Sequence, residues 1–250
     1  MDIGSLIIIF IGGACASAFG ALIGGASIIN IPLLIVLGLP PHVAIGTDRF
    51  GVMGIGWAGL YKFHLKKIVD YRLSFLMAGP TLLGAVLGAN LVFYIPENTL
   101  KVIIILTNIL CLLYLILNPD IGLKEKVQSG GALKYWIGGL LCFIIGVYGG
   151  FYGAMAGTFL AYVLIMWFGK TFIQSAANIK VASIFMTTSA AVVFFLKGAI
   201  DYPLGLALFS GCLCGAYLGA HFSDKIGNLW IKRFFMIVLT AIILKMAFSL

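Results

Sequence analysis

Charged side chains are scarce in this chain. Asp, Glu, Lys and Arg make up 10% of its 250 residues, whereas an average soluble domain carries about 25%. Only eight of these residues are acidic, and the three histidines are scattered along the chain. No Cys/His or carboxylate cluster has the spacing of a metal site or of an acid–base pair. We therefore expect no enzyme, no metal site and no cofactor.

Apolar residues take the place of the missing charge. They make up 62% of the chain, and the mean hydropathy is +1.14. A helix needs about 20 mostly apolar residues to cross the roughly 30 Å core of a bilayer, and this chain contains runs of that length or longer over residues 5–38, 43–62, 71–95, 99–118, 133–168, 172–197, 202–222 and 228–249. These runs predict an all-α, polytopic helical membrane protein with the lipid bilayer as its solvent.

The net charge of +8 does not indicate a nucleic-acid partner. Its Lys and Arg residues gather in the short loops between apolar runs, which is the pattern that sets membrane topology. No basic segment precedes the first apolar run, so we expect that run to be a retained segment and not a cleaved signal peptide.

Two of the apolar runs, 5–38 and 133–168, are too long for one straight crossing. Each is interrupted near its middle, and the interrupting residues are Gly20, Gly24, Gly25, Asn30 and Pro32 in the first, and Gly146, Gly149, Gly150, Gly153 and Gly157 in the second. Backbone groups freed at such a break are tolerated only inside protein or beside a water-filled cavity. We predict that each run is a glycine-broken re-entrant segment or hairpin.

The sequence contains an internal repeat. A shift of 131 residues superposes Leu65-Lys66 on Leu196-Lys197 and Asp70-Tyr71 on Asp201-Tyr202. It also places the Gly-Ala-x-Leu-Gly-Ala motif of residues 84–89 on that of residues 215–220. Repeats at a fixed period indicate copies of one structural unit. We predict a first transmembrane repeat over 1–120, a connecting loop over 121–132 and a second transmembrane repeat over 133–250.

The orientation of the two repeats depends on the broken runs. If each returns to its own side, a repeat has three further spanning helices and the copies are inverted. If each crosses once, a repeat has four spans and the copies are parallel. With the basic loop of Lys62, Lys66 and Lys67 placed inside, the hairpin arrangement also keeps Lys170 and Lys225 inside. Loop charge therefore favours inverted repeats.

One intramembrane cation occurs in each repeat. The shift of 131 places Thr47 on Asn178 and Arg49 on Lys180, so each copy has a cation two residues after a hydrogen-bonding side chain. A cation within a bilayer costs at least a few kcal/mol, so it normally faces a partner or an aqueous path. Arg49 could simply pair with Asp48 or extend to the near surface. The alternative is an anion site where the two copies meet.

The glycine breaks lie upstream of both cations. A helix that begins at such a break presents unpaired backbone N–H groups, which attract an oxyanion. Close helix packing is the other explanation for these glycines. Hydroxyl and amide groups near the breaks could add donors. The predicted substrate-binding residues are Arg49, Thr47, Asp48, Lys180, Asn178, Gly24, Gly25, Ser27, Asn30, Gly149, Gly150, Tyr152 and Gly153.

These motifs resemble the TauE/SafE family of sulfite and organosulfur anion exporters. The resemblance lies in the first glycine break with its proline, and continues through Leu39-Pro40-Pro41-His42, Gly46-Thr47-x-Arg49-Phe50, Val69-Asp70-Tyr71 and the Gly-Ala-x-Leu-Gly-Ala motif, with a matching scheme in the second half. Asp48 departs from the family pattern, in which Asn or Ser often follows the threonine.

The resemblance implies a secondary transporter of a small anion, such as a sulfur oxyanion or organosulfonate, in the plasma (inner) membrane. Alternating access would occur between the two repeats, with a proton or sodium ion as a candidate coupling ion. Two other functions remain open from the residues themselves. They are an anion channel and a non-transporting membrane subunit that serves assembly or sensing.

Overall fold

The computed structural model describes residues 3–23, 25–117 and 132–222. These residues form helices and their connections, and no strand occurs among them. The elements are α1 (Ile3–Ile23), α2 (Ser27–Val36), α3 (Pro41–Leu65), α4 (Tyr71–Leu91), η1 (Val92–Tyr94), α5 (Glu97–Leu117), α6 (Ala132–Phe151), α7 (Ala156–Tyr162), the π-helical η2 (Val163–Trp167), α8 (Phe172–Leu196) and α9 (Tyr202–Phe222). The predicted span 228–249 and almost all of the predicted loop 121–132 lie outside the described residues.

Four of the described helices are long and apolar enough to cross a membrane. They cover Tyr71–Tyr94, Leu133–Phe151, Ile173–Leu196 and Tyr202–His221. The prediction of an all-helical membrane protein is thereby confirmed at the level of fold class.

The first long apolar run is divided into α1 and α2. Gly25, with a φ of +97°, separates the two helices in a conformation that side chains with a Cβ rarely adopt. Beyond Gly25 the chain reverses its direction. The contacts of Gly20 with Ala26 and of Gly12 with Leu33 show that α2 runs back along α1.

The second long run is divided in the same way. Gly153 (φ +76°) and Met155 (φ +58°) separate α6 from α7. The indole Nε1 of Trp167 donates a hydrogen bond to the carbonyl of Lys134 at 2.9 Å, so η2 returns to the beginning of α6. Both interrupted runs therefore fold back on themselves.

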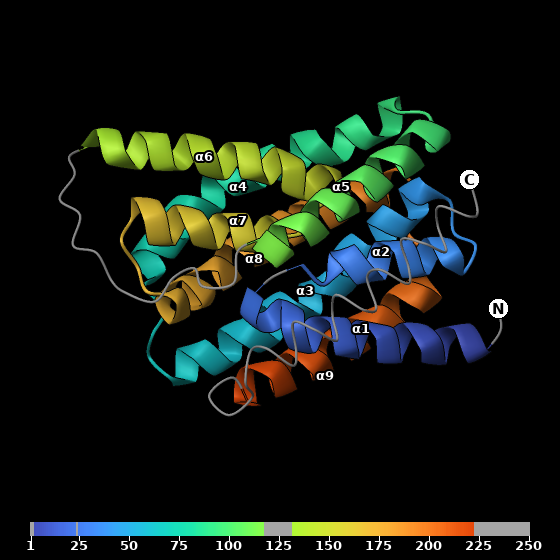
Figure 1. Ribbon diagram of the computed structural model, residues 1–250, viewed down its shortest axis with the longest axis horizontal. Helices are drawn as coiled ribbons and strands as arrows, with labels where there is room; N and C mark the ends of the chain where they lie inside the picture. The colour runs from blue at the N-terminus through green and yellow to red at the C-terminus, as the bar shows by residue number, and fades with distance from the viewer. Residues whose placement is uncertain (1–2, 24, 118–131, 223–250) are drawn as a thin grey trace.

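Helices α3 and α8 run antiparallel through the middle of the bundle. Gly46 near the start of α3 lies against Phe194 near the end of α8, and Gly59 near the end of α3 lies against Lys180 near the start of α8. Figure 1 shows α1 and α9 on one side of this pair and α4 and α6 on the other, with α9 packed on both α1 and α3 and α4 packed on both α6 and α8.

Glycines allow the outer pairs to approach backbone to backbone. A Cβ at Gly88 of α4 would overlap with the carbonyl of Val147 in α6, and a Cβ at Gly219 of α9 would overlap with the carbonyl of Ala18 in α1. In lipid, small residues at helix contacts permit the close van der Waals packing that replaces a hydrophobic driving force. The Gly-Ala-x-Leu-Gly-Ala motifs thus serve packing.

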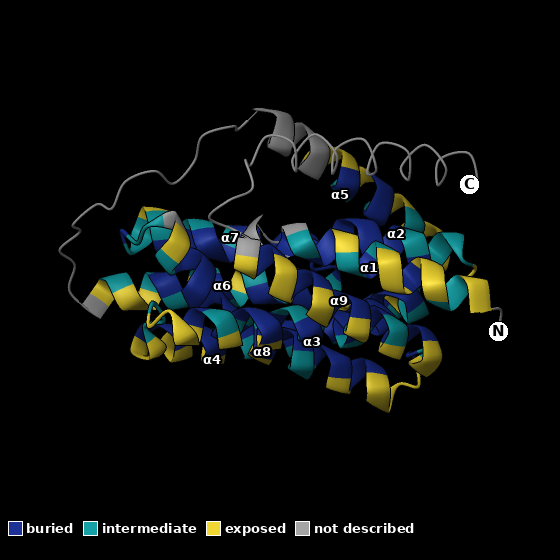
Figure 2. Cartoon of the chain, turned by 90° about the horizontal axis from the view of Figure 1, so that it is seen from below, coloured by how far each residue is buried: buried dark blue, intermediate teal, exposed yellow. Residues whose placement is uncertain are grey.

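Large apolar side chains cover the outside of the bundle, and several of its polar side chains are inside. Leu83, Leu110 and Trp136 are exposed on outward faces, whereas Asp48 and Arg49 are almost completely buried. Figure 2 shows the same pattern, with exposed residues along the outer faces of the helices and buried residues between them. The buried charged residues of α3 lie at its contacts with the two chain breaks.

Candidate functional site

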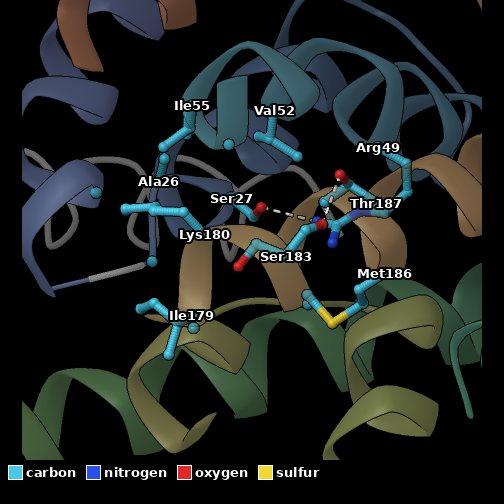
Figure 3. Close-up of a pocket in the computed structure, with 15 residues that line it drawn as sticks. Ala26, Ser27, Arg49, Val52, Ile55, Ile179, Lys180, Ser183, Met186 and Thr187 are labelled. Atoms are coloured by element: carbon cyan, nitrogen blue, oxygen red, sulfur yellow. Dashed lines mark hydrogen bonds between the residues drawn. The ribbon is translucent and has the colours of Figure 1, made fainter. Parts of the chain in front are cut away.

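A pocket lies where the two chain breaks meet α3 and α8. Its volume is about 60 Å³. Figure 3 shows Ser27 from the first break together with Arg49 from α3 and Lys180, Ser183 and Thr187 from α8. Glycines complete the polar part of the wall, namely Gly20, Gly25, Gly56, Gly153 and Gly157. The pocket thus combines two cations, three hydroxyl groups and exposed backbone.

Arg49 connects α3 to both breaks. Its Nη2 donates to Ser27 Oγ at 2.7 Å, at the beginning of α2. The same nitrogen donates to the carbonyl of Tyr152 at 3.1 Å, and Nη1 donates to the carbonyl of Gly149 at 3.0 Å. These two carbonyls belong to the C-terminal end of α6, where the helix dipole favours a positive charge. The guanidinium of Arg49 therefore binds both chain breaks to α3.

Asp48 compensates the charge of Arg49. Its Oδ2 lies 2.5 Å from Arg49 Nη2, and both side chains are no more than 1% exposed. Among the described residues, Arg49 Nε has no hydrogen-bond partner. The pairing alternative from the sequence is therefore present in the structure, and it coexists with a place for Arg49 in the pocket wall.

Lys180 of α8 is the second cation of the pocket wall. The side chain is 3% exposed, and its methylene groups lie against Gly59 of α3, where a Cβ would crowd them. Ser183 and Thr187 follow Lys180 by three and seven positions, so all three lie on the same face of α8. Thr187 Oγ1 also donates to the carbonyl of Ser183 at 2.8 Å. This face of α8 presents a cation and two hydroxyl groups to the pocket.

Five of the residues predicted from the sequence line this pocket. They are Gly25, Ser27, Arg49, Gly153 and Lys180. Gly24 lies outside the described residues. Asp48 stands behind the pocket as the partner of Arg49.

Thr47 and Asn178 occupy equivalent places away from the pocket. Thr47 Oγ1 accepts a hydrogen bond from the backbone N–H of Asp201 at 2.9 Å, just before α9. Asn178 Oδ1 accepts one from the backbone N–H of Asp70 at 2.7 Å, just before α4, and another from Ser74 Oγ at 3.1 Å. Each therefore binds the beginning of a helix of the other half.

The remaining predicted residues have other contacts. Asn30 is buried with its Nδ2 3.9 Å from Cys212 Sγ. The hydroxyl of Tyr152 donates to Asn108 Oδ1 at 2.6 Å. Gly149 contributes its carbonyl to Arg49, as above, and a Cβ at Gly150 would overlap with the backbone of Ala85 in α4. Gly150 thus has the packing role that the sequence left open.

Ser183, Thr187 and Gly157 are pocket residues that the sequence reasoning missed. A signal for the first two was available, because their spacing of three and seven from Lys180 is that of one helical face. Within the parts of the chain that the structure describes, no group of three or more His, Cys, Asp or Glu residues could hold a metal ion.

Comparison with known proteins places these observations in a family. Residues 9–246 match the family described as sulfite exporter TauE/SafE. A relative from Haemophilus influenzae, named "Probable membrane transporter protein", is 29% identical over 100% of this chain and 98% of its own length. The protein YfcA of Escherichia coli K12, with the same designation, is 25% identical over 92% of this chain and 85% of its own length. No solved structure matches the chain. The family match covers nearly the whole sequence. This chain is therefore a membrane protein of the transporter class and not an enzyme, and it belongs to the sulfite exporter TauE/SafE family.

Proposed function

We propose that this protein is a secondary transporter of a small anion of the sulfite type, and that the anion binds in the pocket between Arg49 and Lys180. The observation that carries the proposal is the charge of the pocket wall. Two cations and three hydroxyl groups line it, and no carboxylate is among its described lining residues. Because Asp48 balances Arg49 behind the wall, the net positive charge comes from Lys180, and in a low-dielectric interior this excess favours an anion over a cation.

The size of the pocket supports a small solute. Its volume of about 60 Å³ is that of a small cavity, suited to a solute with few heavy atoms. Sulfite has four heavy atoms. Its oxygens would accept hydrogen bonds from the Lys180 ammonium, from the Ser183 hydroxyl, and from Arg49 Nε, which has no partner among the described residues.

The two repeats are proposed to be inverted copies that span 1–120 and 133–250. The shift of 131 makes α8 the equivalent of α3, and these two helices run antiparallel. Copies related by an axis along the membrane normal would keep equivalent helices parallel, so an antiparallel pair supports an axis in the membrane plane.

Reciprocal contacts also support this arrangement. Thr47 binds the backbone of Asp201, and its equivalent Asn178 binds the backbone of Asp70, the equivalent of Asp201. Such exchange of equivalent partners is the mark of a two-fold relationship. We infer that alternating access arises from movement of one repeat against the other along α3 and α8, with both breaks, as re-entrant hairpins, ending at the anion. The expected location is the plasma membrane, and Asp48 is the candidate group for coupling to a proton.

Transport of [³⁵S]sulfite into proteoliposomes tests the proposal. Lys180→Met keeps the length of the side chain and removes its charge, so the affinity for sulfite should fall about 10–100-fold, the usual cost of a lost charged hydrogen bond. Ser189→Ala is the matched control, because Ser189 lies on α8 but outside the pocket and donates to the carbonyl of Met186. Saturable sulfite uptake that is unchanged in Lys180→Met would refute the site. Uptake that never saturates would indicate a channel.

A further inference from the structure

A second cavity opens at one end of the bundle, away from the proposed transport pocket. It is lined by the first turns of α4 and α6 and by the connection from η2 to α8, and its volume is about 540 Å³. Its charged lining residues are Asp70, Arg72, Lys134 and Lys170. We call it the vestibule.

The vestibule has an excess of positive charge. The one carboxylate among its described lining residues, Asp70, is already engaged. One oxygen caps α4 by accepting from the backbone N–H of Leu73 at 3.2 Å, and the other lies 3.4 Å from Lys170 Nζ. Arg72 and Lys134 bring the described lining to three cations against one carboxylate. The side chains of Asp70 and Lys170 are 42% and 27% exposed, so both remain open to solvent.

The position of these cations on their helices is unfavourable for stability alone. Arg72 is the second residue of α4, Lys134 is the third residue of α6, and Lys170 precedes α8 by two residues. None of the three helices has an acidic residue in its first turn. Helix beginnings normally favour acidic side chains and disfavour cations. The beginnings of α4 and α8 are already capped, by Asp70 and by the Thr171–Gln174 capping box. An external anion in this cavity would therefore be held by the three cationic side chains and not by helix N–H groups.

The shift of 131 residues places no second copy of this cluster in the other half of the sequence. Under the shift of 131, the residues equivalent to Arg72, Lys134 and Lys170 are Pro203, Ile3 and Leu39. The second helix beginning of this kind, at Asp201, thus lacks the three cations. Loop charge that sets topology also gathers at one membrane face, so a control cation at the same end is needed to separate a binding site from a topology signal.

The vestibule walls are held in place by neighbouring aromatic residues. The rings of Phe168 and Tyr135 contact each other in a tilted arrangement with centroids 5.9 Å apart, and Lys134 Nζ lies 5.7 Å from the centroid of the Phe168 ring. The vestibule is also joined to α8, because Asn178, two residues before Lys180, binds the backbone of Asp70.

We propose that the vestibule is a second, peripheral oxyanion site that concentrates the anion at one face before it reaches the pocket. This inference rests on the proposed transport function. The ligand chemistry is a sulfur or phosphorus oxyanion, and its source is either a dissolved anion or the phosphate of a lipid headgroup.

The test uses the full-length protein in nanodiscs of phosphatidylcholine and [³⁵S]sulfate as the probe. The Lys180→Met background weakens binding at the pocket about 10–100-fold, so the high-affinity sulfate binding that remains reports on the vestibule. In that background the Arg72→Gln/Lys134→Gln/Lys170→Gln variant should bind sulfate at least about tenfold more weakly. Lys66→Gln is the matched control, since Lys66 is an exposed cation at the same end of the bundle that does not line the vestibule.

Three outcomes separate the explanations. Loss of sulfate binding in the triple variant, but not in Lys66→Gln, supports a site for the dissolved anion. Unchanged sulfate binding together with loss of co-purifying phosphatidylglycerol supports the same site with a lipid phosphate as its ligand. If neither sulfate binding nor phosphatidylglycerol retention differs from the Lys66→Gln control, the three cations only set topology and the proposal is overturned.

Transport measurements check that the triple variant is folded and distinguish this proposal from the transport pocket. With Lys180 intact, the triple variant should transport sulfite at the normal maximal rate, and its initial rate at low sulfite should fall about tenfold at low ionic strength. The difference should shrink at high salt, where exposed charges are screened. Failure of the pocket would instead appear as unchanged transport in Lys180→Met itself.

Discussion

Replacement of Arg49 by methionine separates its role as a brace from any role as a ligand. Arg49→Met preserves the apolar stem but removes four hydrogen bonds, to Asp48, Ser27 and the carbonyls of Gly149 and Tyr152. It also leaves Asp48, which is 0% exposed, as an isolated buried carboxylate. Breaking a buried ion pair on one side costs about 3–5 kcal/mol. The melting temperature should therefore fall on the order of 10 °C.

Two companion variants test the physical reason. Asp48→Asn/Arg49→Met removes both charges, so it should recover most of the stability lost in Arg49→Met. Asp48→Asn alone should cost less than Arg49→Met, because Ser27 and two carbonyls still accept from the guanidinium. Thermal unfolding of the purified protein in detergent, followed by tryptophan fluorescence, measures all three. If Arg49→Met melts like the unmodified protein but no longer transports sulfite, the brace is refuted and Arg49 acts only through the anion.

Two glycine substitutions test the backbone geometry. Gly153→Ala should lower stability far more than Gly198→Ala in the same unfolding assay. Both positions have positive φ, which costs about 1 kcal/mol or more for alanine, but only at Gly153 would the Cβ also overlap with the Arg49 guanidinium. Equal effects of the two substitutions would contradict this contact. On α4, Gly88→Ala should be destabilising because its Cβ would overlap with the backbone of α6. A Cβ at Gly79 would have nothing within 4 Å, so Gly79→Ala should be neutral or stabilising by about 0.5–1 kcal/mol. A destabilised Gly79→Ala would show that the packing argument is wrong.

The class of the protein and its family could be read from the sequence alone. Apolar runs of spanning length, few charges and the broken segments depend only on local composition, which is visible in one dimension. The internal shift of 131 residues identified Arg49 and Lys180 as equivalent positions of the two halves. Both cations do line one pocket.

The contacts around the pocket were not visible in the sequence. Apolar residues surround these helices on all sides, since lipid and the protein interior are equally apolar, so periodicity does not distinguish the face that meets lipid from the face that meets protein. Consequently Thr47 and Asn178 were expected at the anion, whereas they bind the beginnings of helices in the opposite half.

The sequence by itself determined the components of the site: a strongly apolar chain, two breaks in long apolar runs, and one cation within an apolar run of each half. The tertiary structure decided how these parts meet. Arg49 is 100 residues from Gly149 and 103 from Tyr152, and a contact over that separation depends on how the two halves pack. Only the folded bundle brings the carbonyl end of α6, the hydroxyl of Ser27 and the cationic face of α8 around one small cavity.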